Sequence, residues 1–126
     1  AHGRINPDNL FYGDSLTVGE CISEPCGYSQ DFHFEPVERM QALPAGKGEC
    51  SVADDIYALG ILAAWLRIGA GILAEPNRLL HLKRLLRDGT HYALVGNREL
   101  SDTIKDLLRG TLNDNTLERW TSTQLK

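Results

Sequence analysis

Two ionisable side chains lie where acid–base chemistry could be expected from their type and position. His2 could serve as a general base, because an unperturbed imidazole titrates near neutral pH. Asp55 could serve as a catalytic carboxylate, because it stands at the start of a strongly apolar segment. A carboxylate near a helix N-terminus is also stabilised by the helix dipole, and Asp54 beside it suits a capping or solvated position. A position near a helix N-terminus suits a structural role for Asp55. Residue type and position alone do not decide between a catalytic and a structural role for His2.

The cysteines could bind a metal ion only if their spacing allowed it. Cys21 and Cys26 are five positions apart and Cys50 is isolated, whereas zinc sites present pairs of Cys or His at short spacing, twice over. We therefore expect no metal site and no bound cofactor, and we interpret the three cysteines as reduced thiols. The remaining histidines are scattered and expected to be exposed: His33, His81 and His91.

The overall charge argues against one broad class of function. Asp and Glu outnumber Lys and Arg by 17 to 13, which gives a formal net charge of -4. Binding to a phosphate backbone depends on clustered positive charge, so we do not expect a nucleic-acid partner. The chain has 126 residues, 42% apolar and 24% charged, which is the composition of one ordinary globular domain.

The most apolar stretch, residues 56–74, needs to be tested as a membrane span. A spanning helix requires about 20 apolar residues with few or no charges. Here Arg67 and several glycines interrupt the stretch, so we expect a buried core helix and no membrane span in this segment. The first residues resemble neither a signal peptide nor a transit peptide, and reduced thiols suit the cytoplasm, where we expect the protein to be.

The elements that position these side chains divide the chain into two parts. Residues 1–50 are so rich in Pro and Gly that no long helix fits, although residues 10–12 and 16–18 could form two short strands around a turn at Gly13. Residues 51–126 have helical patterns. Ser51 is a good N-cap, with Asp54 placed to reach back to it, and the positions after it are apolar or small all round, which indicates a buried helix.

Further helices follow this buried one. The pattern predicts a second helix from about Asn77 to Gly89, a third that is capped by Ser101 and ends before Gly110, and a short fourth after Thr121. The expected fold class is mainly α, in one domain over residues 1–126, with a loop-rich front and a short β-hairpin.

Several motifs, in this order, resemble the C-terminal lobe of the protein-kinase fold. Residues 2–10, HGRINPDNL, resemble the kinase catalytic loop, whose usual form is HRDLKPEN. Residues 36–38, PVE, stand where the APE segment would end the activation loop. Residues 55–60, DIYALG, resemble the DVWSLG start of the buried central helix, and residues 107–121 resemble the closing stretch that contains Arg-Trp-Thr. The resemblance implies that residues 1–50 correspond to the catalytic loop and activation segment, and residues 51–126 to the helical body.

At the catalytic positions the sequence departs from the family pattern. The loop Asp, which accepts the proton of the substrate hydroxyl, is replaced by Arg4, and a guanidinium stays protonated at physiological pH. The neighbouring Lys is replaced by Asn6, and Gly19 stands where the Asp of Asp-Phe-Gly would bind magnesium. Only Asn9 is retained at a metal position. Glu20 and Asp14 are nearby carboxylates, which we do not expect to substitute.

The scaffold positions are retained. The resemblance implies that His2 packs beneath the loop, that Asp55 accepts backbone N–H groups from the loop, and that Gly60 belongs to the buried helix. It also implies a buried ion pair between Glu38 and Arg119. On this basis we expect Glu38→Ala to loosen the fold far more than Glu35→Ala.

The resemblance implies a pseudokinase fragment without enzymatic activity, which acts as a protein-binding or regulatory module. The alternative is a truncated piece of a divergent serine/threonine kinase, an ATP-dependent phosphotransferase whose N-lobe is missing from this sequence. The expected partner is another protein, and homo-oligomers are a further possibility, because a surface meant for a missing N-lobe would be apolar and such patches drive self-association.

Overall fold

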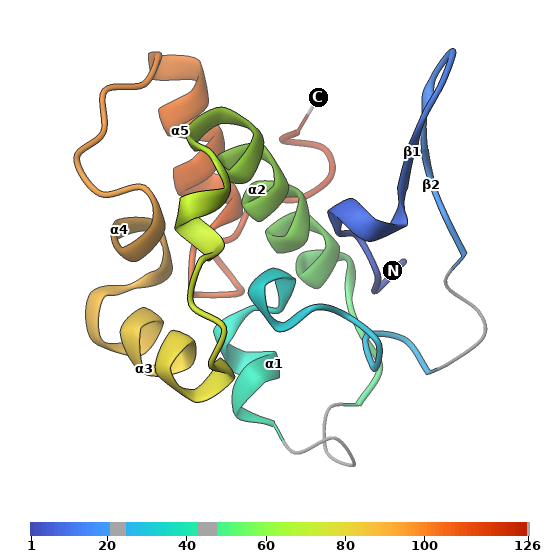
Figure 1. The fold of residues 1–126 in the computed structure, drawn as a ribbon, viewed down its shortest axis with the longest axis horizontal. Coiled ribbons are helices and arrows are strands. Elements are labelled where there is room, and N and C mark those ends of the chain that lie inside the picture. The colour runs from blue at the N-terminus through green and yellow to red at the C-terminus, as the bar shows by residue number, and fades with distance from the viewer. Residues whose placement is uncertain (21–24, 43–47, 126) are drawn as a thin grey trace.

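One long helix, α2 (Val52–Ile68), runs through the middle of the fold in the computed structural model, which describes residues 1–20, 25–42 and 48–125 (Figure 1). Its start is fixed as the sequence predicts, because Asp54 Oδ2 accepts a hydrogen bond from the Ser51 N–H at 2.7 Å. It ends at Gly69, whose φ of 119° is unfavourable for residues with a side chain. The expected buried helix is confirmed.

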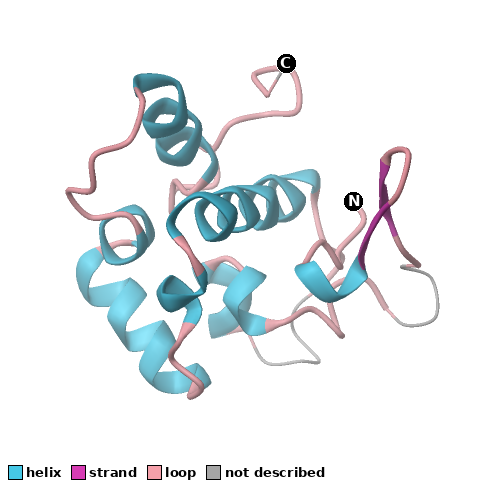
Figure 2. Ribbon diagram, turned by 45° about the horizontal axis from the view of Figure 1, so that its top comes forward, coloured by secondary structure: helices cyan, strands magenta, loops and turns pink. Residues whose placement is uncertain are grey.

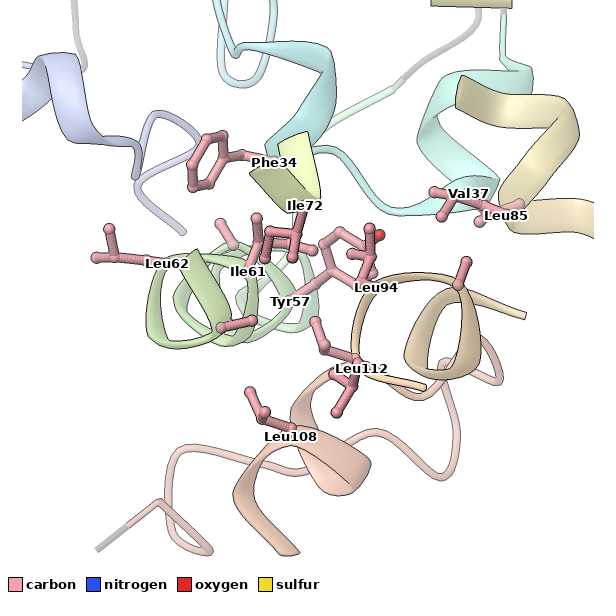
Figure 3. Close-up of a cluster of buried hydrophobic side chains, with 14 of the residues drawn as sticks. Phe34, Val37, Tyr57, Ile61, Leu62, Ile72, Leu85, Leu94, Leu108 and Leu112 are labelled. Carbon is pink, nitrogen blue, oxygen red and sulfur yellow. The ribbon is translucent and has the colours of Figure 1, made fainter. Parts of the chain in front are cut away.

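The core is built on both sides of α2 (Figure 3). On one side lie Phe34, from the short helix η2 (Phe32–Phe34), and Ile72, from η4 (Ala70–Leu73). On the other side lie Leu108 and Leu112, from α5 (Asp102–Thr111) and its C-cap. The two helices approach closely at Gly60, where a Cβ atom would meet the side chains of Thr111 and Leu112. Glycine is therefore needed at position 60 for this crossing of α2 and α5.

The remaining helices cover one flank of α2. They are α3 (Arg78–Asp88) and α4 (Thr90–Leu94), which contact each other, and α1 (Val37–Gln41), which packs on α3. As predicted, α3 begins after Asn77, whose side chain accepts from the Leu80 N–H, and ends at Gly89.

The hairpin lies at one edge of the molecule and continues directly from a short helix (Figure 2). After the short helix η1 (Pro7–Asn9), strand β1 (Leu10–Tyr12) pairs antiparallel with β2 (Leu16–Val18), with Leu10 opposite Val18. Both strands were predicted from the sequence and are confirmed. Several of their apolar side chains are exposed, Tyr12 to 91%.

The mainly α fold with a short hairpin is confirmed, with three local differences. The five-residue helices α1 and α4 were not expected. Gly110 lies inside α5 instead of just after it. The predicted helix after Thr121 is wrong, because residues 122–125 form turns. Within the described residues, none of the helices combines the length and apolar character that crossing a lipid bilayer requires.

The cysteines differ from the expectation of reduced thiols. Cys26 and Cys50 form a disulfide with a Cα–Cα distance of 5.7 Å, within the usual range for such bonds. Sequence spacing gave no sign of the pair, because its members are 24 positions apart in the loop-rich part of the chain. The disulfide removes the argument from reduced thiols for a cytoplasmic location. Cys21 lies outside the described residues.

His81 also differs from expectation, since it is only 1% exposed. Its ring lies on α3 beside the rings of His33 and Phe32, with centroid distances of 4.9 and 5.6 Å. Neither ring nitrogen has a hydrogen-bond partner among the described residues. Burial, followed by the nearby charges of His33 and Arg84, lowers the pKa of His81 from 6.5 to about 4.

This buried imidazole should make the fold acid-sensitive. The unfolded state binds a proton at His81 below about pH 6.5 and the folded state only near pH 4, so stability falls as the pH drops through this window. Between about pH 7 and pH 5 the loss should be roughly 2 kcal/mol, measured by urea unfolding at each pH. In His81→Leu this part of the pH dependence should disappear. An unchanged pH profile in that variant would show that the acid sensitivity comes from other groups.

Candidate functional site

The loop formed by residues 2–9 is attached to the N-terminal end of α2 by a single carboxylate. Asp55 Oδ2 accepts from the His2 N–H at 2.5 Å, and Asp55 Oδ1 accepts from the Gly3 N–H at 2.8 Å. Asp55 lies in the first turn of α2, where the helix dipole also favours a negative charge. Its carboxylate therefore holds the loop backbone.

The His2 ring is used within the loop. Its Nδ1 accepts from the Arg4 N–H at 3.2 Å, so the neutral ring has its proton on Nε2, which donates to the Gly19 carbonyl at 2.9 Å. The ring thus joins residues 2–9 to the end of β2. Since both nitrogens have backbone partners, this arrangement leaves no ring nitrogen directed at a substrate.

Asn6 is buried and its amide is also used inside the protein. The Asn6 Nδ2 group donates to Gln30 Oε1 at 2.8 Å, and Gln30 Nε2 donates to the Ile5 carbonyl at 3.1 Å. This pair of contacts joins the loop to residues 25–30. Asn6 therefore connects two loops at the position where the kinase pattern has a Lys.

The kinase pattern has a pair of metal ligands at the positions of Asn9 and Gly19, and the surroundings of these two residues differ from such a pair. The Asn9 Nδ2 group donates to the carbonyls of Arg4, at 3.0 Å, and Glu20, at 3.2 Å. A Cβ atom on Gly19 would meet Asn9 Oδ1 and lie 2.7 Å from the Phe11 ring. Position 19 thus lacks a carboxylate, and a side chain there would require the Asn9 amide and the Phe11 ring to shift. In the part of the chain that the structure describes, no three His, Cys, Asp or Glu side chains converge as a metal site would require.

Arg4 and Glu20 face each other at the centre of this site. Arg4 Nη1 lies 3.7 Å from Glu20 Oε2, and both side chains are partly exposed. The hollow that they help to line has a volume of only about 10 Å³, which is room for roughly one water molecule. Glu20 therefore neutralises the cation at position 4, and Asp14 lies at the exposed tip of the hairpin.

Glu38 and Arg119 form an ion pair beside the N-terminal end of α2. Arg119 Nη1 and Nη2 lie 2.9 and 3.4 Å from the two Glu38 oxygens. The Arg119 side chain is 0% exposed, and it also donates to the carbonyls of Asn113 and Ala53. Its guanidinium lies 5.2 Å from the centre of the Tyr57 ring. Arg119 therefore joins α1, the start of α2 and the segment after α5.

Sequence reasoning missed Arg39, which is as buried as the core. Its Nη1 donates to the Glu49 carbonyl at 3.3 Å, and a Cβ atom on Gly27 would lie 2.7 Å from its Nη2. Arg39 thus joins the two segments that the disulfide also links. No pattern distinguishes it, because a basic residue on a five-residue helix usually faces solvent.

Comparison with known proteins gives limited similarity. No protein-family model matches the chain, and no solved structure matches it significantly. It is 30% identical over 112 residues to the tryptophan biosynthesis protein TrpCF of Buchnera aphidicola. The aligned region covers 86% of this chain and 23% of that protein. It is also 24% identical over 139 residues to the phosphorylase b kinase gamma catalytic chain, liver/testis isoform, of Bos taurus. That alignment covers 98% of this chain and 33% of the kinase chain. The chain thus spans about a quarter to a third of the length of these relatives.

Proposed function

We propose that this chain is part of a kinase-like module that has lost catalysis and acts by binding another protein. The observation that supports the loss of catalysis is the ion pair between Arg4 and Glu20, whose charged atoms lie 3.7 Å apart. A guanidinium cannot accept a proton from a substrate hydroxyl, and here it is neutralised by the nearest carboxylate. The similarity to a phosphorylase b kinase catalytic chain, over 98% of this chain, supports the kinase-like part of the proposal.

The metal positions support the same conclusion. Phosphoryl transfer by kinases needs magnesium ions held by an Asp and an Asn. The Asn9 amide instead holds two backbone carbonyls, and its oxygen occupies the space where a side chain at position 19 would begin. A substitution at position 19 would therefore have to displace the Asn9 amide from its present bonds before a metal site could form.

An exposed apolar surface supports the binding role. It lies between the hairpin and the C-terminal half of α2 and has a hollow of about 450 Å³, lined by Pro7, Leu10, Tyr12, Leu16, Leu62, Trp65 and Leu66. Its rim includes Tyr12, Leu16 and Leu66, each more than 60% exposed, and a cluster of exposed large apolar side chains is typical of a surface that binds another polypeptide. We infer that a partner protein covers it.

The proposal predicts that nucleotide leaves the protein unaffected. In the full gene product that contains this chain, magnesium and ATP at millimolar concentration should not change the melting temperature relative to magnesium alone. A ligand that binds only the folded state raises stability by mass action, so differential scanning fluorimetry is a direct readout. A clear upward shift, or transfer of the γ-phosphate to a protein substrate, would favour the divergent-kinase alternative instead.

The same preparation tests which polypeptide covers the apolar surface. Light scattering over a range of protein concentrations reports self-association, which a second copy on this surface would cause. A concentration-independent monomer mass would exclude a second copy as the occupant.

A further inference from the structure

A second hollow, between α4 and α5, gathers basic side chains. It has a volume of about 200 Å³ and is lined by His91, Val95, Gly96, Asn97, Arg98, Lys105 and Arg109. Lys105 and Arg109 are four residues apart on α5, so they project from the same face of that helix. Arg98 and Asn97 come from the loop that joins the two helices, and His91 comes from α4. None of the lining residues is Asp or Glu.

The basic side chains lack acidic partners. Among the described residues, no salt bridge involves Arg98, Lys105 or Arg109, although Asp102 and Asp106 lie on the same helix as the last two. The Arg98 guanidinium is positioned by donating from Nη1 to the Leu94 and Val95 carbonyls, both at 3.1 Å. The hollow is therefore a fixed concentration of positive charge on a chain whose net charge is -4.

His91 adds a further donor to this hollow. Its Nε2 atom is buried and has no hydrogen-bond partner among the described residues. Burial, followed by the positive charge of Arg109, lowers the pKa of His91. A bound anion would offset the effect of Arg109 on this ring.

An adjoining hollow shares His91 and Arg109 with this one and also contains Asp88 and Asp114. Asp88 pairs with Arg87 at 2.9 Å, and Asp114 accepts from the Thr90 N–H at 2.9 Å. Among the described residues, neither carboxylate forms a salt bridge with Arg98, Lys105 or Arg109.

We propose that this basic hollow binds a phosphate monoester. A dianion with three equivalent oxygens matches several convergent cations, and the Arg fork suits phosphate geometry. The space of about 200 Å³ is far more than the roughly 10–15 Å³ that one water molecule needs, and is enough for a phosphate group and a few attached atoms. The phosphate can belong to a small metabolite or to a phosphorylated side chain of a partner protein. The inference does not depend on the proposed function, because it concerns a different face of the chain.

The test uses inorganic phosphate as the first probe. Phosphate should raise the melting temperature of this chain more than chloride does at equal ionic strength, and it should shift the His91 imidazole resonances toward those of the protonated ring. The double substitution Lys105→Gln with Arg109→Gln should weaken phosphate binding at least about tenfold, because it removes two of the charged donors that line the hollow.

The matched control removes one Lys and one Arg elsewhere on the surface. Lys83→Gln with Arg67→Gln changes the net charge equally, at exposed positions outside the hollow. This control should bind phosphate as the unmodified chain does. Equal binding by both double variants, or no phosphate-specific change in the unmodified chain, overturns the proposal.

Two further probes separate the sources of the phosphate. Glycerol phosphate represents a small metabolite, and a phosphoserine peptide represents a modified partner. The probe that binds more tightly than inorganic phosphate identifies the source of the phosphate. This tighter binding should be lost in the Lys105 and Arg109 double variant.

Discussion

Replacing Glu38 with alanine should lower the free energy of unfolding by about 3 kcal/mol, because it leaves the Arg119 guanidinium buried without its counter-charge. Arg119 is 0% exposed, whereas the Glu38 side chain is 37% exposed, so we expect the lower end of the range for broken buried pairs. Arg119 would keep its bonds to the Asn113 and Ala53 carbonyls, which do not neutralise it. Urea unfolding at neutral pH measures the loss.

The choice of control follows from the structure. Glu35→Ala was expected to be the less destabilising substitution. However, Glu35 is only 4% exposed and its carboxylate lies 3.8 Å from Arg78. Glu99 is a better control, since it is exposed. Glu99→Ala should change the unfolding free energy by less than about 0.5 kcal/mol, as surface substitutions usually do. Similar losses for Glu38→Ala and Glu99→Ala would mean that the ion pair contributes nothing measurable.

Loss of the disulfide should have a comparable effect. Cys26→Ser opens a covalent loop whose ends are 24 positions apart, and a loop of that length contributes about 3 kcal/mol by restricting the unfolded chain. A reducing agent should lower the melting temperature of the unmodified chain and leave that of Cys26→Ser unchanged, as scanning calorimetry can measure. The variant also removes the Cys26 sulfur that packs against Gly3.

Alkylation followed by mass spectrometry checks the pairing itself. The sequence has three cysteines, so the disulfide limits labelling to at most one before reduction, and three should be labelled in the unfolded, reduced chain. Three labels without reduction would show that the thiols are free. In that case the reduced state expected from the sequence would be the correct one.

Elements with strong local signals were predictable. The long helix α2 has an N-cap at Ser51 and an apolar circumference, and α3 lies between Asn77 and Gly89. The hairpin was apparent from two short apolar runs around Gly13. The five-residue helices α1 and α4 were not predictable, because so few residues give no periodic pattern and tertiary packing stabilises them.

The candidate site was predictable in its residues and much less in its interactions. The offset from His2 identified position 4, but only the structure places Glu20 beside Arg4 and the Asn9 amide in the space at Gly19. These contacts lie at the base of the hairpin, where its register brings Asn9 opposite Gly19, and the sequence alone did not show this register. The disulfide and the burial of His81 depend on the whole fold, because the segments that they join are distant in sequence.

The hydrogen bonds that Asp55 accepts allow the loop to keep its conformation while its side chains change in evolution. Asp55 contacts the main-chain N–H groups of His2 and Gly3, which every residue except proline possesses. The loop conformation therefore depends little on which side chain stands at position 4. A mutation there can abolish chemistry without a penalty in folding, and selection for shape alone would then preserve the carboxylate of Asp55 while Arg4 drifts.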